Sequence, residues 1–340
     1  MGKMKAVFIK EPGKIEIIEQ EIPFPKKGEA LLKIKYCGIC GSDIATYTGN
    51  QPFATYPRIP GHEFSAEIVE VGENGMGLKP GMVVTANPYF NCGQCYSCQR
   101  GLVNCCEKNE TMGVQRDGAF AEYITMPVER IYYGKGLPAD TLALIEPFSI
   151  GYHAVNRGNI QAGENVLIIG SGSIGLFTML SAKLKGAKVY VADINEERLN
   201  YAKKLGVDGV IDSGKHNLKE EVMKITDSHG MDVCIEAVGI SETFLDCIEN
   251  VAFGGKVILV GNGKTESTFN HTVLVKKELN VFGSRNSLKD FEPLIDLVSI
   301  TRVDINSLVS DVFELKDAAE AFECLKNLNK SKMKVLVKFE

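Results

Sequence analysis

The segment ENVLIIGSGSIGLFTMLSAKL (residues 164–184) decides half of the fold. A short apolar run, typical of a buried strand, leads into Gly170-Ser-Gly172-Ser-Ile-Gly175 and then into a helical pattern. Gly170 permits a tight turn, Gly172 lets the backbone approach a pyrophosphate, and Gly175 lets the helix and the strand pack closely. The glycine pattern alone is weak evidence. Between a strand and a helix, it predicts a dinucleotide site with the helix N-terminus at the phosphates.

The next predicted strand, KVYVAD, ends at Asp193, about twenty residues after the glycines. A carboxylate there accepts hydrogen bonds from the ribose hydroxyls and repels a 2′-phosphate, which favours NAD over NADP. Arg198 could reach a phosphate, although a place beside the adenine or ribose is the easier interpretation. The alternative for Asp193 is that it only caps the following helix, EERLNYAKKL.

Several further residues are expected at the cofactor, mostly where later strands end. The alternative to a cofactor contact is that small residues at strand ends only form turns. It applies to Ala237, Val238, Gly239, Val260 and Gly261. The full set of predicted cofactor contacts is Gly170, Gly172, Ser173, Ile174, Gly175, Asp193, Arg198, Ala237, Val260, Gly261, Ser284 and Arg285.

Strand and helix patterns alternate from about Ala162 to Asn286, which predicts a doubly wound parallel sheet. The preceding part is different, because short alternating strands between Pro and Gly breaks indicate a barrel or a sandwich. The last predicted strand, MKVLVKF, is expected to return to this β-rich part. We therefore predict a β-rich domain of residues 1–150 and 287–340 with an inserted nucleotide-binding domain of residues 151–286.

Four cysteines lie close together in NCGQCYSCQRGLVNCCE (residues 91–107): Cys92, Cys95, Cys98 and Cys106. Tight turns at this spacing can aim four thiolates at one point, as a closed tetrahedral zinc site requires. We predict a structural zinc lobe at about residues 90–107, with Cys105 as an alternative fourth ligand. A disulfide cluster is disfavoured because the chain is long, shows no signal peptide, and has its other cysteines dispersed.

A second set of metal ligands is more widely spaced. CGICGSD contains Cys40, PGHEF contains His62 and Glu63, and ALIEPF contains Glu146. Each residue alone has an ordinary explanation, such as a core histidine or a helix cap. Together they suit a zinc ion that is held by three protein groups with one position open, which is a Lewis acid for an alcohol oxygen.

Composition excludes several classes of protein. The chain has 340 residues, 44% hydrophobic and 24% charged, with a formal net charge of -5. These values are typical of a globular protein with two domains, and there is no basic cluster of the kind that binds nucleic acid. No apolar stretch approaches the roughly 20 residues that span a bilayer.

Together, the GHE motif, the cysteine lobe, the CGSD turn and the glycine fingerprint resemble the zinc-dependent medium-chain dehydrogenases over essentially the full chain. Glu146, where alcohol dehydrogenases have a cysteine, is similar to sorbitol and threonine dehydrogenases. GNQPFATYPRIPGHE, NCCEK, ALIEPF and GSRNS resemble a bacterial sugar-acid group, L-galactonate 5-dehydrogenase and the starvation-sensing oxidoreductases. The implied fold is a GroES-like β-barrel domain with an inserted Rossmann domain.

The resemblance implies two zinc ions per subunit and NAD, with NADP less favoured. It implies that Cys40 and His62 bind the catalytic zinc, and that Glu63 and Glu146 ligate it or hold its water. Ser42 would begin a proton relay, and Asp43 would be structural. One departure is Ala45, because the family commonly has a histidine there as the outer proton carrier. The relay must then use water, ribose hydroxyls or another group such as Glu146.

The expected activity is oxidation of a secondary alcohol of a sugar acid or polyol, in a cytoplasmic homodimer or homotetramer. Alternatives are L-threonine 3-dehydrogenase, sorbitol or polyol-phosphate dehydrogenase, and a non-enzymatic sensor of NAD or a metabolite. A zinc-free quinone reductase is disfavoured. The strand in FGGKVILVGN is a candidate dimer edge. Candidate substrate contacts, each with a purely structural alternative, are Gln51, Phe53, Tyr56, Arg58, Arg285 and Asn286.

Overall fold

The computed structural model describes residues 2–263, 265–326 and 332–340. The chain forms two compact units: unit 1 is Met1–Glu146 with Phe291–Glu340, and unit 2 is Pro147–Asp290. The sequence analysis placed the two boundaries between the domains at 150/151 and 286/287. In the structure the chain passes between the units after Glu146 and after Asp290. Glu146, which was expected at a domain junction, is therefore the last residue of the first stretch of unit 1.

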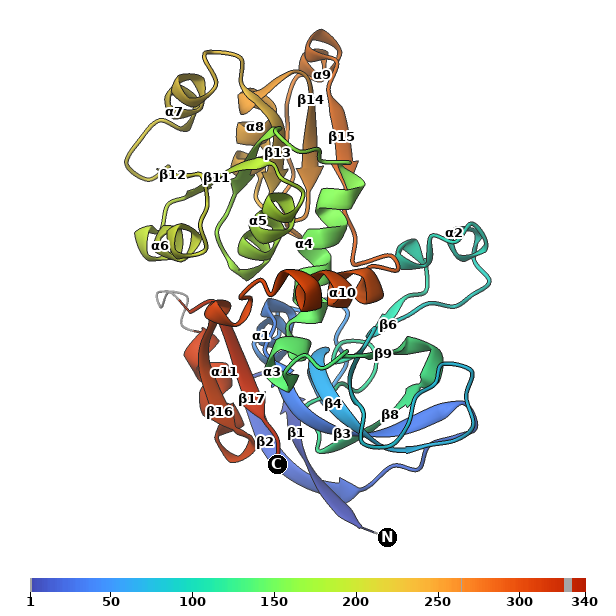
Figure 1. Cartoon of the computed structure of the whole chain (residues 1–340). Helices are drawn as coiled ribbons and strands as arrows, with labels where there is room; N and C mark the ends of the chain where they lie inside the picture. Colours follow the sequence, from blue (N-terminus) through green and yellow to red (C-terminus); the bar gives the residue numbers. More distant parts are fainter. Residues whose placement is uncertain (1, 264, 327–331) are drawn as a thin grey trace. The chain divides into compact units, whose positions relative to one another are not determined.

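Unit 1 contains a seven-stranded sheet in the order β16-β17-β3-β4-β5-β9, with β8 also paired to β3 (Figure 1). Its strands are β3 (Glu29–Gly38), β4 (Glu63–Val71), β5 (Val83–Ala86), β8 (Tyr123–Pro127), β9 (Ile131–Tyr133), β16 (Val309–Glu314) and β17 (Lys334–Lys338). The expected return of the last strand is confirmed, because β17 pairs antiparallel with β3 and parallel with β16. Two small two-stranded sheets complete the unit: β1 (Lys3–Glu11) with β2 (Lys14–Glu21), and β6 (Tyr89–Phe90) with β7 (Glu110–Thr111).

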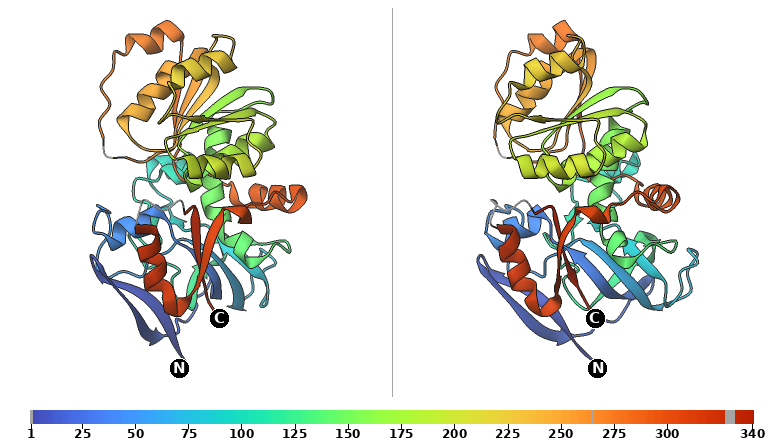
Figure 2. Two further views of the ribbon diagram at one scale, coloured as in Figure 1. Left: turned by 90° about the vertical axis from the view of Figure 1, so that its left-hand side faces the viewer. Right: turned by 60° about the vertical axis from the view of Figure 1, so that its left-hand side comes forward.

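Short helices close the core of unit 1. Its α-helices are α1 (Gly41–Tyr47), α2 (Tyr96–Gln99), α3 (Ala139–Ala143), α10 (Phe291–Thr301) and α11 (Ala318–Lys326), and its 3₁₀ helices are η1 (Val103–Cys105), η2 (Val128–Arg130), η3 (Asn306–Leu308) and η4 (Leu315–Asp317). Figure 2 shows α11 beside β16 and β17. Ala321 and Phe322 of α11 are fully buried in one core with Val335 and Val337 of β17. This packing fixes β17, which carries a residue of the candidate site.

Unit 2 is built on a six-stranded parallel sheet in the order β12-β11-β10-β13-β14-β15. The strands are β10 (Asn165–Ile169), β11 (Lys188–Asp193), β12 (Gly209–Asp212), β13 (Met231–Glu236), β14 (Val251–Leu259) and β15 (Asn280–Gly283). The prediction that FGGKVILVGN forms an edge was wrong. The chain adds one more parallel strand after it, so β14 lies between β13 and β15, and β15 is the edge.

Helices cover both faces of this sheet, with α5 and α6 on one face and α7 and α8 on the other (Figure 2). The helices are α4 (Ile145–Arg157, which begins in unit 1), α5 (Ser173–Leu184), α6 (Glu196–Lys204), α7 (Leu218–Ile225), α8 (Ser241–Asn250) and α9 (Thr272–Lys277). Leu167 and Ile169 of β10 share a core with Val222 of α7 and Cys247 of α8. In the part of the chain that the structure describes, no helix has the length and apolar character of a membrane span.

Candidate functional site

The cysteine lobe lies in the loops around α2. Among residues 2–263, 265–326 and 332–340, two groups of His, Cys, Asp or Glu residues bring at least three ligand atoms within 4.8 Å of one another. One group is Cys92, Cys95, Cys98 and Cys106, and Cys105 does not belong to it. Four thiols at this separation match the donor set of a closed structural zinc site.

Backbone N–H groups favour the thiolate forms in this lobe. The amide of Cys92 donates to Sγ of Cys106 at 3.2 Å, and the amide of Cys95 donates to Sγ of Cys92 at 3.4 Å. Amides of Glu107 and Cys98 lower the pKa of Cys95 to about 6, whereas burial raises the pKa of Cys98 to about 11. A zinc ion requires deprotonated thiols, so the lobe already supplies part of the stabilisation that the metal completes.

The second group is Cys40, His62 and Glu63. Cys40 directly precedes α1, and His62 and Glu63 stand at the start of β4, which pairs with β3. Glu63 is fully buried and His62 is almost so. Because one thiol, one imidazole and one carboxylate converge here, the set fits an ion that keeps a position open.

Glycine makes room for this arrangement at two positions, Gly38 and Gly61. A Cβ on Gly38, at the end of β3, would lie 2.4 Å from Oε2 of Glu63. Gly61 has a φ of +97°, a conformation that residues with a side chain rarely adopt. A Cβ there would also lie 2.7 Å from Sγ of Cys37. The glycine of the GHE motif is therefore required by the turn that presents His62.

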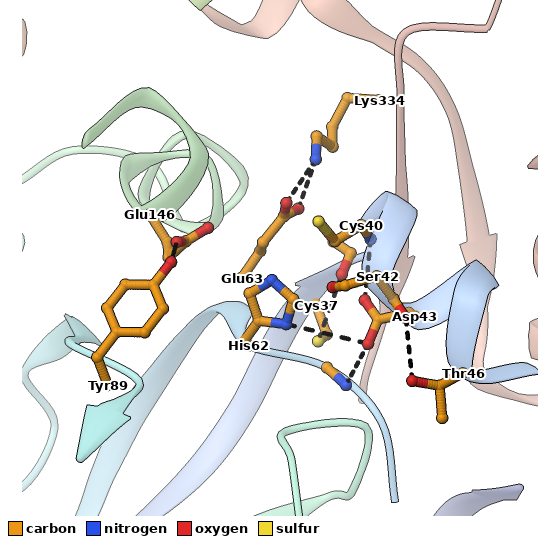
Figure 3. Close-up of polar contacts among 12 residues, drawn as sticks. Cys37, Cys40, Ser42, Asp43, Thr46, His62, Glu63, Tyr89, Glu146 and Lys334 are labelled. Atoms are coloured by element: carbon orange, nitrogen blue, oxygen red, sulfur yellow. Dashed lines mark hydrogen bonds and ion pairs between the residues drawn. The ribbon is translucent and has the colours of Figure 1, made fainter. Parts of the chain in front are cut away.

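Asp43 fastens the two turns that carry the donors (Figure 3). Its Oδ2 accepts a hydrogen bond from the amide of Cys40 at 2.9 Å, and its Oδ1 accepts one from the amide of Gly61 at 2.9 Å. Oδ1 also lies 4.0 Å from Nδ1 of His62. Burial raises the pKa of the Asp43 carboxyl group. These contacts are those of the structural partner that the sequence predicted.

Two polar atoms beside the donors have no hydrogen-bond partner within the described ranges: Oγ of Ser42 and Nδ1 of His62, both buried. Burial disfavours a charged imidazole, but Cys40, Asp43 and Glu146 outweigh it, so the pKa of His62 is raised well above its usual value. Buried polar atoms are normally satisfied. The unpaired hydroxyl and the concentrated negative charge therefore fit a site for a cation and a polar substrate.

A buried lysine faces this cluster from β17. Nζ of Lys334 lies 2.6 Å from Oε1 and 2.7 Å from Oε2 of Glu63, and both residues are at most 2% exposed. Burial disfavours the ammonium form, but Glu63 and Cys40 overcome it, so the pKa of Lys334 is raised. The lysine therefore stays charged and neutralises Glu63, one of the three donors.

Glu146 lies beside the donor group but does not belong to it. It stands in the first turn of α4, where its Oε1 accepts a hydrogen bond from the hydroxyl of Tyr89 in β6 (Figure 3). Burial raises the pKa of Glu146 to about 7, against the opposing effect of His62. The structure thus brings three of the four predicted ligands together and gives Glu146 a different hydrogen-bonding partner.

The fingerprint glycines of unit 2 lie between the end of β10 and the first turn of α5. Gly170 has a φ of +103°, and a Cβ on Gly175 would lie 1.9 Å from the carbonyl oxygen of Gly170. A Cβ on Gly172 would meet nothing within 4 Å in the described structure. The missing side chain at Gly172 therefore leaves open space at the start of α5, which fits a pyrophosphate at a helix N-terminus. Ser173 and Ile174 form the first turn of α5.

Asp193 ends β11 beside the glycine loop. Its Oδ2 accepts hydrogen bonds from the amide of Ser171 at 2.7 Å and from its hydroxyl at 2.8 Å. The interpretation of Asp193 as a helix cap was wrong, because the N-cap of α6 is Asn195, whose side chain accepts from the amide of Arg198. Nε of Arg198 is a buried donor with no partner among the described residues.

Other predicted cofactor residues surround the same strand ends. Glu236, at the end of β13, accepts hydrogen bonds from the amides of Val238 and Gly239, each at 2.8 Å. The carbonyl of Glu236 accepts from the amides of Val260 and Gly261. The carboxylate of Glu236 therefore holds Val238 and Gly239, and its backbone carbonyl holds Val260 and Gly261. The amide of Ala237 donates instead to the carbonyl of Ile169. Ser284 and Arg285 follow β15 in sequence, and Oγ of Ser284 is buried without a partner in the described part of the chain.

The structure does not bring the candidate substrate residues together around one point. Arg58 pairs with Asp117 at 3.0 Å and also donates to the hydroxyl of Thr55 in its own loop, so its guanidinium already has protein partners. The side chain of Phe53 is 68% exposed. Tyr56 donates a hydrogen bond to the carbonyl of Thr46. Gln51 donates its amide to the carbonyl of Ala45, Asn286 has a φ of +51°, and Arg285 is exposed.

Sequence reasoning missed three residues: Tyr89, Glu236 and Lys334. Glu236 and Lys334 each stand in a largely apolar strand segment, MDVCIE and MKVLVK, and an ionisable residue buried in a strand requires a partner. That signal could have identified them as paired residues, although it does not name the partner. Tyr89 gives no such signal, because tyrosine is common in strands.

Comparison with known proteins assigns the family. Residues 26–135 match the alcohol dehydrogenase GroES-like domain, and residues 173–299 match the zinc-binding dehydrogenase domain. The chain is 36% identical over 324 residues to L-galactonate-5-dehydrogenase of Escherichia coli K12, covering 95% of both chains. It is 34% identical over 321 residues to the sorbitol dehydrogenase of Halalkalibacterium halodurans, covering 93% of both.

Solved structures agree with this assignment. A short chain alcohol dehydrogenase (rspB) from Escherichia coli CFT073, in complex with NADH, has a TM-score of 0.93 and 31% identity, covering 99% of both chains. A putative zinc-binding dehydrogenase from Sinorhizobium meliloti 1021, bound to NADP, has a TM-score of 0.92 and 30% identity, covering 99% of this chain and 100% of that chain. The chain therefore belongs to the zinc-type medium-chain alcohol dehydrogenases, with a GroES-like domain and a Rossmann-type nucleotide-binding domain.

Proposed function

We propose that the protein oxidises a secondary alcohol of a sugar acid or polyol to the ketone, with NAD as the hydride acceptor. The observation that carries the proposal is the buried group of Cys40, His62 and Glu63, a mixed donor set beside the unpaired hydroxyl of Ser42. The similarity to L-galactonate-5-dehydrogenase and to sorbitol dehydrogenase supports this substrate class.

Zinc and a nicotinamide cofactor, when bound, supply a Lewis acid for the alcohol oxygen and an acceptor for its hydride. Cys40, His62 and Glu63 would hold the metal, while Asp43 keeps the two donor turns in register. Ser42 is placed to take up the hydroxyl proton of the substrate, because its Oγ is buried next to Cys40 without a partner in the described structure. Cys92, Cys95, Cys98 and Cys106 would hold a second, structural zinc ion.

The preference for NAD rests on Asp193. Its carboxylate stands next to the glycine loop and is bonded to Ser171, so a 2′-phosphate on the adenosine ribose would meet a fixed negative charge. Arg198 is the feature that could favour NADP, since a guanidinium binds phosphate well. We assign it a place beside the adenosine instead: its backbone amide donates to Asn195 at the start of α6, and its Nε is buried without a partner among the described residues.

The deciding experiment is a substrate panel with the purified, zinc-loaded protein. Sugar acids including L-galactonate, polyols including sorbitol, and L-threonine would each be tested with NAD and with NADP, following reduced cofactor by absorbance. The expected outcome is highest kcat/KM for a sugar acid or polyol with NAD. A clear preference for L-threonine would replace the substrate assignment, and no turnover on any compound would favour the sensor hypothesis.

We further propose a cytoplasmic homodimer or homotetramer that associates through the β15 edge. Val281 of β15 is 39% exposed, and Val275 of the preceding α9 is 77% exposed. An open strand edge with apolar side chains commonly pairs with another chain. Light scattering on the protein and on a Val281→Lys variant would test this, with a smaller particle expected for the variant.

A further inference from the structure

Tyr89 and Glu146 form a contact that the proposed reaction does not yet use. The hydroxyl of Tyr89 donates to Oε1 of Glu146, which is only 2% exposed. In Figure 3 the two side chains meet on the far side of His62 and Glu63 from Cys40. Burial, followed by the charge of Glu146, raises the pKa of Tyr89 well above its usual value, so the phenol remains a donor.

The strand that carries Tyr89 is held firmly. The amide of Tyr89 donates to Oδ1 of Asn87 at 2.9 Å, and its carbonyl accepts from Nη1 of Arg130. The ring of the next residue, Phe90, lies 4.4 Å from the guanidinium of Arg130 and 3.6 Å from that of Arg116. Contacts of this kind fix the backbone of β6, so the phenol is preorganised before any ligand binds.

The same strand leads into the zinc lobe. Asn91 accepts a hydrogen bond from Nη2 of Arg130 at 2.8 Å, and Nδ2 of Asn91 lies 3.8 Å from Sγ of Cys98. Cys92, a member of the four-thiol group, follows immediately. The lobe therefore anchors one end of the segment whose other end presents Tyr89 to Glu146.

A free carboxylate at this place would be a good zinc ligand. Glu146 is close enough to His62 and Glu63 for their charges to affect its pKa. If it moved onto the metal, it would take the position that an alcohol needs. The hydrogen bond from Tyr89 instead engages the carboxylate outside the group of Cys40, His62 and Glu63.

We infer that Tyr89 is a positioning residue that holds Glu146 off the metal and so keeps the substrate position open. The inference rests on the proposed metal site of Cys40, His62 and Glu63, and it deepens the proposed function. It assigns the zinc lobe a role in catalysis at a distance, because the lobe holds β6 in place.

The test is Tyr89→Phe in protein whose metals are replaced by Co²⁺, with azide as the probe of the open position. Azide adds to a cobalt ion with an open position and changes its visible spectrum, whereas the four-thiolate lobe is closed and does not respond. We expect azide to bind the variant about tenfold more weakly and the metal to leave to a chelator about tenfold more slowly. Both changes follow if Glu146 becomes the fourth ligand.

Two further variants test whether Tyr89 acts through Glu146. Glu146→Gln keeps a hydrogen-bond acceptor but removes the anionic ligand, so Tyr89→Phe in that background should no longer change azide binding or metal release. Tyr47→Phe is the matched control, because Tyr47 also donates to a glutamate, Oε1 of Glu323 at 2.7 Å, elsewhere in unit 1. It should leave both measurements unchanged.

The inference is overturned if Tyr89→Phe binds azide and releases metal as the parent protein does. It is equally overturned if the changes persist undiminished in the Glu146→Gln background, because Tyr89 would then act by another route. None of these measurements needs a substrate. A failed substrate panel would therefore remove the proposed activity and still leave the role of Tyr89 to be decided by the spectra.

Discussion

The two candidate metal sites of this protein lie in one structural unit but are built in opposite ways. The lobe takes all four donors from fifteen consecutive residues, Cys92 to Cys106, and stabilises them with nearby backbone amides. The second site takes Cys40, His62 and Glu63 from two separate segments and adds Lys334 from β17 near the other end of the chain.

This difference corresponds to two functions. Four thiolates at short spacing satisfy a metal completely, so such a site stabilises a fold. A buried mixed set with a counter-ion costs more to assemble, because each charge loses its hydration, and it is kept where chemistry needs an open metal position.

The largest effect is expected for Cys40→Ala. Removing the thiolate should lower turnover at least about a thousandfold, because an essential metal ligand is lost. NADH binding, followed by its fluorescence, should be retained because Asp193 and the glycine loop are untouched. Elemental analysis should find one zinc ion per chain in place of two. Undiminished turnover in a variant with one zinc would refute the role given to this site.

The next largest effect is expected on the stability of unit 1, for a variant of Lys334. Lys334→Met leaves Glu63 as an unpaired buried charge and should lower the free energy of unfolding of unit 1 by about 3–5 kcal/mol. Urea unfolding can be followed by circular dichroism, which suits a chain without tryptophan. Adding Glu63→Gln to Lys334→Met should recover part of the loss, since no uncompensated carboxylate remains.

A surface pair provides the control for that measurement. Lys3 and Glu19, also in unit 1, lie 3.6 Å apart, with side chains 65% and 63% exposed. Lys3→Met should cost no more than about 1 kcal/mol, because water screens an exposed pair. Equal losses of stability for Lys334→Met and Lys3→Met would show that burial does not strengthen the pair of Lys334 and Glu63.

The smallest effect is expected in the lobe. Cys106→Ser should release the structural zinc and make residues 91–107 sensitive to protease, while turnover falls less than in Cys40→Ala. Cys105→Ser should change neither property, because Cys105 lies outside the four-thiol group. Zinc content and limited proteolysis of the pair distinguish the two neighbouring thiols. Loss of zinc from Cys105→Ser alone would reverse the assignment.

Local patterns predicted most of the fold and only part of the site. The glycine fingerprint and the cysteine lobe are each specified within about twenty residues, so their structures followed from spacing. The Rossmann-type unit and the return of β17 also followed from alternating patterns. The edge of the sheet did not, because it was assigned to FGGKVILVGN by analogy with relatives, whereas the next strand, β15, pairs beyond it.

The partners of the glutamates could not be predicted. Lys334 and Glu63 are 271 positions apart, and the pairing of β17 with β3 and of β3 with β4 brings them together. Tyr89 of β6 reaches Glu146 of α4 across 57 positions, a tertiary contact that no local pattern records. One-dimensional spacing names candidate ligands, but it does not decide which carboxylate a neighbouring cation or phenol will engage.

The ion pair between Glu63 and Lys334 has a consequence for the electronics of the site. Because the ammonium group cancels the carboxylate, Cys40 is the one donor of the three that brings uncompensated negative charge. A divalent ion seated there would keep a net positive charge and remain a strong electron-pair acceptor. The same ion among four thiolates would sit in a net negative complex and would be chemically inert.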